Sequence, residues 1–277
     1  MKSKYHNYTS EHLDDGVFVK YSYNKNIKIT LFVFHDLCEH HKRFEEFFQN
    51  FLNYKKINLV YCDFKGHGLS SGTRSHFENF ANISRTIEAV INKFKEDKKE
   101  NDKWLMLGHG LGGMAIIDFI RNYNPDTIQF VNGIILSNFI PLASDDFILK
   151  NEFKSFNLFR KNRVISSQKN LVSKYEQLKY DSDPFLLTGP TQLTIDSIKK
   201  KIKELCQDSY YISNYVLLLN STEKNSKCYN LIEQFSKGIK KDFLTKKHYP
   251  HLRHDLYNDK NNELVLNDLI IWVSSYE

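Results

Sequence analysis

The sequence predicts an α/β fold in which helices cover both faces of a mostly parallel sheet. Four short apolar runs, at residues 27–35, 57–63, 104–107 and 130–136, have the composition of strands that are buried on both faces. Segments whose apolar residues follow a helical spacing alternate with these runs. This alternation is typical of a doubly wound parallel sheet, and 277 residues with 41% hydrophobic content suffice to bury it.

The other elements can be placed in order around these strands. Residues 1–15 are polar and are expected to be loose, whereas residues 17–23 alternate as a strand. The expected helices lie at residues 42–54, 77–95, 114–123, 191–205, 229–237 and 263–273. Two further strands are expected at residues 215–219 and 241–249.

The stretch between residues 139 and 200 breaks this rhythm. It is aromatic and polar, and it contains no clear strand. We interpret it as a helical lid that is inserted over the sheet. The predicted organisation is therefore a first core part (1–138), a lid (139–200) and a second core part (201–277).

Composition and charge exclude several classes of function. The net charge is +6, but the lysines are scattered along the chain, and no nucleic-acid-binding motif is recognisable, so no nucleic-acid partner is expected. The first residues lack the apolar segment of a signal peptide, and no apolar run approaches the length of about 18 residues that a transmembrane segment needs. Four widely spaced cysteines indicate reduced thiols. We expect a cytoplasmic protein, with a peripheral membrane surface as a further partner.

One strand ends in a glycine-rich turn that has the layout of a nucleophile elbow. The strand at 104–107 runs into Gly108-His109-Gly110-Leu111-Gly112-Gly113, and a helix follows. Strand, sharp turn and helix form the elbow that is written Gly-x-Ser-x-Gly. Gly108 and Gly112 occupy the two glycine positions, but Gly110 stands where the nucleophile should be.

Four motifs in order resemble those of the monoacylglycerol lipase/lysophospholipase branch of the α/β-hydrolases, which is grouped with the serine aminopeptidase S33-like hydrolases. Residues 35–40 (His-Asp-Leu-Cys-Glu-His) are similar to the family's His-Gly-x-Gly-Glu-His. Residues 63–74 are similar to Asp-x-Arg-Gly-His-Gly-x-Ser-x-Gly-x-Arg, and residues 108–113 to Gly-His-Ser-x-Gly-Gly. Residues 249–254 resemble the loop that carries the catalytic histidine. The resemblance covers about residues 16–275 and implies an α/β-hydrolase fold.

The resemblance implies hydrolysis of carboxylic esters in single-acyl glycerolipids by a serine, a histidine and an aspartate. His254 matches the base, but the nucleophile position holds Gly110, which has no side chain. The acid position holds Lys224, whose ammonium group only donates and cannot accept an imidazole N–H. The adjacent Glu223 could replace the acid if the loop shifts its register.

The same resemblance places an oxyanion hole at the backbone N–H groups of Leu37 and Leu111, with His35 and His109 beside it. Backbone donors persist when side chains change. However, Asp36 and Cys38 replace two glycines of the family motif. A carboxylate at position 36 would oppose the negative charge that develops in the oxyanion hole.

No cofactor and no metal are expected. His35, His40 and His41 are close in sequence, but their spacing matches no short zinc motif. We interpret them as loop residues that belong to the family motif.

Two main hypotheses for the function remain open. In the first, the chain is a pseudo-hydrolase that has lost turnover and either binds a single-acyl lipid or acyl ester or pairs with another protein through the lid surface. In the second, it is an active ester hydrolase that uses His254 with Glu223 and an unidentified nucleophile. Cys38, Ser70, Ser71 and Ser137 are candidates, but none of them is flanked as an elbow. A hydroxyl, thiol or carboxylate within hydrogen-bond reach of His254 would favour the second. A third hypothesis is an interaction module whose pocket is filled by lid aromatics.

Overall fold

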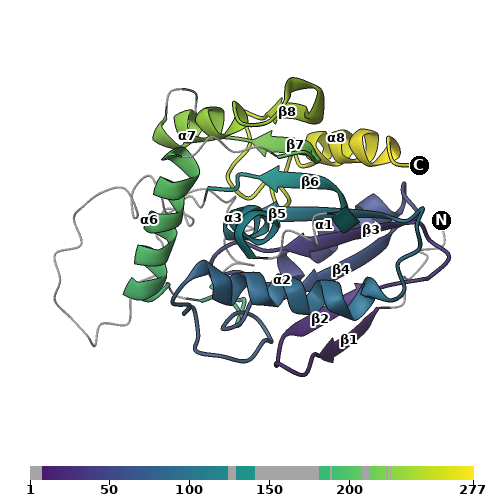
Figure 1. The fold of residues 1–277 in the computed structure, drawn as a ribbon, viewed down its shortest axis with the longest axis horizontal. Helices are drawn as coiled ribbons and strands as arrows, with labels where there is room; N and C mark the ends of the chain where they lie inside the picture. Colours follow the sequence, from purple (N-terminus) through teal and green to yellow (C-terminus); the bar gives the residue numbers. More distant parts are fainter. Residues whose placement is uncertain are drawn as a thin grey trace.

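The computed structural model describes residues 8–123, 129–140, 181–187, 189–207, 212–222, 224 and 226–277. These residues form an eight-stranded sheet with helices on both faces (Figure 1). The strand order is β1-β2-β4-β3-β5-β6-β7-β8. Strands β3 to β8 run parallel to one another, whereas β1 is antiparallel to β2 and β2 is antiparallel to β4. The predicted α/β architecture is therefore confirmed.

The strands are β1 (Thr9–His12), β2 (Phe18–Ser22), β3 (Ile29–Phe34), β4 (Asn58–Cys62), β5 (Lys103–His109), β6 (Val131–Ser137), β7 (Tyr215–Asn220) and β8 (Leu244–His248). The helices are α1 (Lys42–Leu52), α2 (Phe80–Lys95), α3 (Leu111–Asp118), α6 (Gln192–Gln207), α7 (Lys227–Ser236) and α8 (Glu263–Ser274). A π-helical turn, η1 (Phe119–Tyr123), continues α3, and a 3-10 turn, η4 (Lys241–Phe243), precedes β8.

The central strands are apolar on both faces, and their side chains divide between two core clusters. In β3, Phe32 and Phe34 enter one cluster, whereas Leu31 and Val33 enter the other. This division follows from the two-residue period of a strand. Because both faces are covered by helices, the strand needs an unbroken apolar run, which is the pattern seen in the sequence.

Each core cluster is completed by its own helices. On one face, the buried phenylalanines of α1 and the apolar residues of α8 pack on the sheet. On the other face, α2, α3, α6 and α7 contribute the apolar side chains. Because strands β3 to β8 are parallel, the loops at their carboxyl ends lie at the same edge of the sheet. Ligand sites of open α/β sheets lie at that edge.

Most expected elements are confirmed, and two expectations need correction. Residues 1–15 are not all loose, because Thr9–His12 forms the edge strand β1 and pairs with β2. Its side chains are mostly exposed, which explains why the sequence lacks the apolar alternation of a strand. The helix expected to reach residue 123 changes to a π-helical turn at Phe119.

The predicted lid is only partly within the described residues. Residues 141–180 lie outside them, and of the rest the structure shows the helix α6, which was expected at 191–205. The three-part organisation therefore stays a prediction. None of the helices in the described part of the chain is both long and apolar enough to cross a membrane.

Candidate active site

The turn between β5 and α3 has the backbone of a nucleophile elbow. Gly110 adopts φ +50° and ψ −117°, a conformation that strains residues with a side chain. Its N–H donates to the carbonyl of Ser137, at the end of the neighbouring strand β6 (3.0 Å). A Cβ atom at Gly112 would lie 2.3 Å from the carbonyl oxygen of Phe34, so this glycine lets α3 approach β3. The elbow is intact, although its central residue carries no reactive group.

The carboxylate of Asp36 fills the space beside Gly110. Its Oδ1 accepts hydrogen bonds from the backbone N–H of Leu37 (2.6 Å) and of Leu111 (2.7 Å). These are the two donors that the resemblance assigns to the oxyanion hole. A Cβ atom at Gly110 would lie 1.9 Å from Asp36 Cγ, so a serine cannot share this space with Asp36 as it stands.

The second carboxylate oxygen of Asp36 contacts the histidine. Asp36 Oδ2 lies 3.0 Å from His254 Nε2, and both side chains are buried. Burial by itself would raise the pKa of Asp36, but the hydrogen bond and the charge of His254 outweigh it, helped by His109 and the Leu111 N–H. The pKa of Asp36 is consequently lowered, and the group is a carboxylate at neutral pH.

Hydrogen bonds from Asn138 and Ser221 fix the backbone of the loop that carries His254. The Nδ2 of Asn138, just beyond β6, donates to the backbone carbonyl of His254 (2.7 Å) and to Ser221 Oγ (2.9 Å). Ser221 Oγ in turn donates to the carbonyl of Arg253 (2.9 Å). The imidazole ring therefore has a fixed place, and its centroid lies 4.8 Å from that of His109.

Among the described residues, no acid is bonded to His254 Nδ1. His254 Nδ1, which an acid would face, is buried and has no hydrogen-bond partner among the described residues. Lys224 is exposed, and Glu223 lies outside the described residues. The replacement of the acid by Glu223 therefore stays a prediction.

His35 braces the loop that carries Asp36. Its Nδ1–H donates to the carbonyl of Asp36 (2.7 Å), and its Nε2 accepts the N–H of Phe64 (3.0 Å). Complete burial lowers the pKa of His35 to about 3, so the ring is neutral and can both donate and accept. It is a structural link between two loops, and it does not contact His254.

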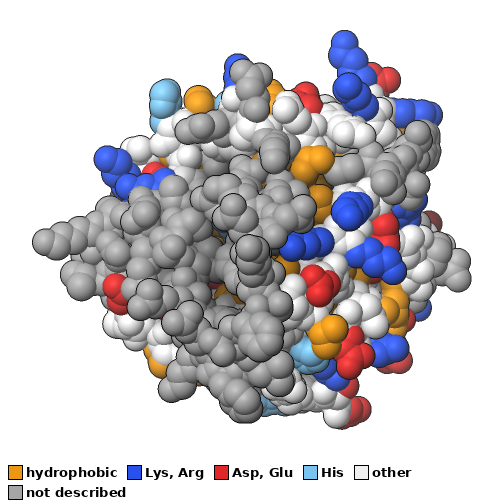
Figure 2. All heavy atoms as spheres, turned by 90° about the vertical axis from the view of Figure 1, so that its left-hand side faces the viewer, with side chains coloured by type: hydrophobic (Ala, Val, Ile, Leu, Met, Phe, Trp, Pro, Cys, Tyr) orange, Lys and Arg blue, Asp and Glu red, His pale blue; other side chains and the backbone are white. Residues whose placement is uncertain are grey.

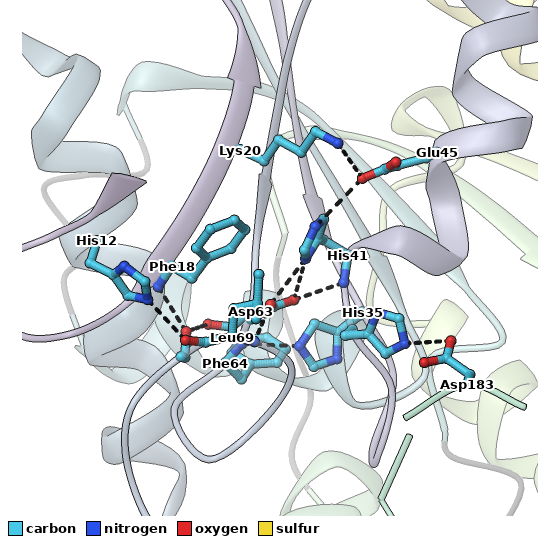
Figure 3. Close-up of polar contacts among 12 residues, drawn as sticks. His12, Phe18, Lys20, His35, His41, Glu45, Asp63, Phe64, Leu69 and Asp183 are labelled. Atoms are coloured by element: carbon cyan, nitrogen blue, oxygen red, sulfur yellow. Dashed lines mark hydrogen bonds and ion pairs between the residues drawn. The ribbon is translucent and has the colours of Figure 1, made fainter. Parts of the chain in front are cut away.

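A second buried carboxylate organises the same loops, as Figure 3 shows. Asp63 Oδ1 accepts the backbone N–H (2.7 Å) and the Nδ1–H (2.9 Å) of His41, and its Oδ2 accepts the N–H of Leu69 (2.8 Å). Although burial would raise it, these bonds lower the pKa of Asp63 to about 2. His40 pairs with Asp183 (2.9 Å). His35, His40 and His41 thus each have a structural partner.

The other nucleophile candidates are engaged away from His254. Burial raises the pKa of the Cys38 thiol to about 12, and its sulfur lies 3.0 Å from Ser75 Oγ. Ser70 Oγ donates to the carbonyl of Asp63 and accepts the N–H of Phe18 (2.8 Å). Ser137 Oγ lies 3.1 Å from His109 Nδ1, and Ser71 is exposed. Among the described residues, the group bonded to His254 Nε2 is the carboxylate of Asp36.

The structure brings Gly110, Leu37, Leu111, His109 and His254 to one place, as the motifs led us to expect, while their roles stay predictions. The sequence placed the Asp36 carboxylate beside the oxyanion hole, but its bonds to both backbone donors and to His254 were not foreseen. The sequence contained a signal for this arrangement. Asp36 stands where the family motif has a glycine, and Gly110 stands where the elbow motif has a serine. Such a pair indicates that one side chain has replaced the other.

Comparisons with known proteins agree with this fold. The profile of the family described as "Serine aminopeptidase, S33" matches residues 25–261. A monoacylglycerol lipase of Paleococcus ferrophilus is similar over 90% of this chain and 95% of its own, with 18% identity and a TM-score of 0.64. A soluble variant of monoglyceride lipase from Saccharomyces cerevisiae, in complex with a substrate analog, is similar over 100% and 97%, with 17% identity and a TM-score of 0.71.

A third solved structure is similar to the same extent. A highly thermostable carboxyl esterase from Bacillus coagulans, in complex with glycerol, covers 98% of both chains with 15% identity and a TM-score of 0.66. At these identities, the likeness concerns the fold. No curated protein matches the sequence.

Proposed function

Because this chain belongs to the serine aminopeptidase S33 family of α/β-hydrolases, we propose that it is a pseudo-hydrolase whose own Asp36 blocks the reaction centre. The family's reaction requires a nucleophile on the elbow and two free donors for the oxyanion. Here the elbow carries Gly110, and the donors Leu37 and Leu111 are bonded to Asp36.

The single observation that carries this proposal is the bonding of Asp36 Oδ1 to both backbone donors. The oxyanion of a tetrahedral intermediate would need the same two N–H groups, and it would meet the negative charge of Asp36. Removal of one such donor typically costs about 10²–10³ in kcat. With both donors occupied and no serine, hydrolysis of an ester by the family's route has no support.

For the ligand, we propose a single-acyl lipid or acyl ester. The likeness to monoacylglycerol and monoglyceride lipases supports this class. A peripheral membrane surface is the weaker partner, because Lys and Arg are interspersed with Asp and Glu on the described part of the face in Figure 2. A cytoplasmic location belongs to the same proposal, and the buried free thiols of Cys38 and Cys62 support it.

The test is an ester-hydrolysis assay of the purified chain beside His254→Ala. A short-chain chromogenic ester, a monoacylglycerol and a lysophospholipid serve as substrates. The proposal predicts equal, near-background rates for both proteins, together with saturable binding of the monoacylglycerol without product. Turnover that disappears in His254→Ala would contradict the loss of catalysis, and absence of binding would contradict the ligand.

The second candidate function is an active ester hydrolase, and one observation favours it. A carboxylate, Asp36, lies within hydrogen-bond distance of His254 Nε2. If Asp36 took part in turnover, Asp36→Asn would abolish a measurable wild-type rate. The pseudo-hydrolase proposal expects no wild-type rate to lose, so the same assay distinguishes the two.

A further inference from the structure

Three side chains that can bind a metal ion meet at the blocked reaction centre. Asp36, His109 and His254 each place one ligand atom within 4.8 Å of the other two, and all three residues are buried. In the part of the chain that the structure describes, this is the one group of three or more His, Cys, Asp or Glu side chains with such spacing. Two imidazoles and one carboxylate form a donor set that suits Zn²⁺ and similar divalent transition metals.

The hydrogen bonds of His109 leave one of its nitrogens free. Its Nδ1–H donates to the carbonyl of Ser137 (3.1 Å), which puts the lone pair on Nε2. Nε2 is buried and has no hydrogen-bond partner among the described residues. Burial lowers the pKa of His109 to about 4, so the ring is neutral at physiological pH. Metal-binding histidines typically have this arrangement, with one N–H on a backbone carbonyl and the other nitrogen on the metal.

Asp36 is held in a similar way. Oδ1 is fixed by the N–H groups of Leu37 and Leu111, while Oδ2 faces His254 Nε2 at 3.0 Å. The two amides would orient a metal-bound carboxylate from behind, as outer-shell donors do. Asp36 Oδ2 and His254 Nε2 share one proton in their hydrogen bond. A metal ion that binds both atoms would replace that proton.

We propose that Asp36, His109 and His254 form a binding site for a divalent transition metal of the Zn²⁺ type. Asp36 Oδ2 and the Nε2 atoms of the two histidines supply three donors, and solvent or a ligand supplies the rest. Neighbouring donors around tetrahedral zinc lie about 3.3 Å apart at the usual Zn–N and Zn–O distances. The most separated pair therefore closes by up to about 1.5 Å when the metal binds. This proposal does not depend on whether the chain hydrolyses esters.

The test uses the full chain without a polyhistidine tag, after dialysis against a chelator. Zn²⁺ is titrated against a chromophoric chelator in excess Mg²⁺, since Mg²⁺ prefers oxygen ligands and should not compete. The wild type should bind one Zn²⁺ per chain. Asp36→Asn, His109→Gln and His254→Gln should each weaken binding by at least about 100-fold, because even outer-shell changes cost 10–100-fold.

His40→Gln is the matched control, because His40 is also buried and bonded to an aspartate, Asp183. Its affinity for Zn²⁺ should equal that of the wild type. Far-ultraviolet circular dichroism checks that each variant is folded. A measurement on the wild type alone completes the test, since Co²⁺ bound by these residues gives the intense visible bands of a four- or five-coordinate ion.

Two results would overturn the proposal. One is a wild type that binds no Zn²⁺, or that binds Co²⁺ with only the weak bands of a six-coordinate ion. The other is an affinity that stays unchanged in folded His109→Gln and His254→Gln, which would place the metal elsewhere.

Discussion

Asp36 and Gly110 act as a complementary pair of residues. The carboxylate occupies the space beside the elbow, where a Cβ at position 110 would come within 1.9 Å of Asp36 Cγ. Glycine also accepts the φ of +50° without strain. Loss of the nucleophile therefore makes room for a side chain that satisfies both backbone donors and the histidine. Restoring the serine alone should be unfavourable.

This pairing predicts a thermodynamic coupling between the two positions. Gly110→Ser should lower the free energy of unfolding by about 1–3 kcal/mol, because it combines crowding with an unfavourable φ. In Asp36→Gly/Gly110→Ser the crowding is absent, so the double variant should be more stable than the sum of the single effects predicts. Urea unfolding of the four proteins measures the cycle. Simple additivity would show that the two side chains do not compete for space.

The buried histidines predict a loss of stability in acid. Burial lowers the pKa of His67 and of His109 to about 4, and of His35 to about 3, from the ordinary value of 6.5. Between about pH 4 and pH 6.5, these histidines bind more protons in the unfolded chain than in the folded chain. The free energy of unfolding should therefore fall as the pH drops from about 6.5 towards 4.

Urea unfolding midpoints over that pH range measure this effect. His109→Gln should make the fall shallower, since it removes one of the groups that take up a proton on unfolding. The exposed His251→Gln serves as the control and should leave the slope as it is. A wild-type midpoint that is independent of pH over this range would contradict the neutral state of these rings.

At the scale of elements, the site depends on hydrogen bonds that join the ends of β6 and β7 to the loop that carries His254. Asn138 follows β6, its N–H donates to the carbonyl of Leu219 in β7 (2.9 Å), and its side chain bonds Ser221 and the His254 carbonyl. These bonds connect two strands with the histidine loop. Asn138 therefore positions His254 although it does not touch the imidazole.

Asn138→Gly isolates the contribution of that side chain. The residue has φ +39°, which glycine adopts readily, so the substitution removes hydrogen bonds without adding strain. Loss of buried partners for the Ser221 N–H and the His254 carbonyl should cost about 1–3 kcal/mol. Chemical denaturation measures the change, with the exposed Asn53→Gly as the control. An effect no larger than that of the control would show that the Asn138 side chain does not stabilise the loop that carries His254.

The central elements could be predicted because their sequence patterns are set by local geometry and by burial on both faces. β3 and residues 104–107 of β5 are mostly apolar, and α1 has five buried phenylalanine and leucine side chains at helical spacing. The edge strand β1 could not be predicted, because an exposed edge needs no apolar pattern and its pairing with β2 is a tertiary contact.

At the scale of the whole molecule, the site was predictable as a place but only partly as a chemical arrangement. The motifs located Gly110, His254 and the two backbone donors. The bonds of Asp36 to the Leu111 N–H and to His254 could not be predicted, since these partners are 75 and 218 residues away. Side-chain direction in such a loop is decided by the packing of distant segments.

The proposed loss of catalysis likewise depends on segments from the whole molecule. The loop after β3 supplies Asp36, the turn between β5 and α3 supplies the elbow, and the loop after β8 supplies His254. The most direct test compares Gly110→Ser/Lys224→Asp with Asp36→Gly/Gly110→Ser/Lys224→Asp in the ester-hydrolysis assay. Both proteins carry the family's serine and acid, and they differ only at Asp36.

If Asp36 blocks the reaction centre, the double variant should show background rates and the triple variant should turn over substrate, and a further His254→Ala change should abolish this turnover. The difference should reach at least about 10²-fold, the effect of losing one oxyanion donor. Equal rates in the two proteins would contradict the claim that the Asp36 carboxylate blocks the reaction centre.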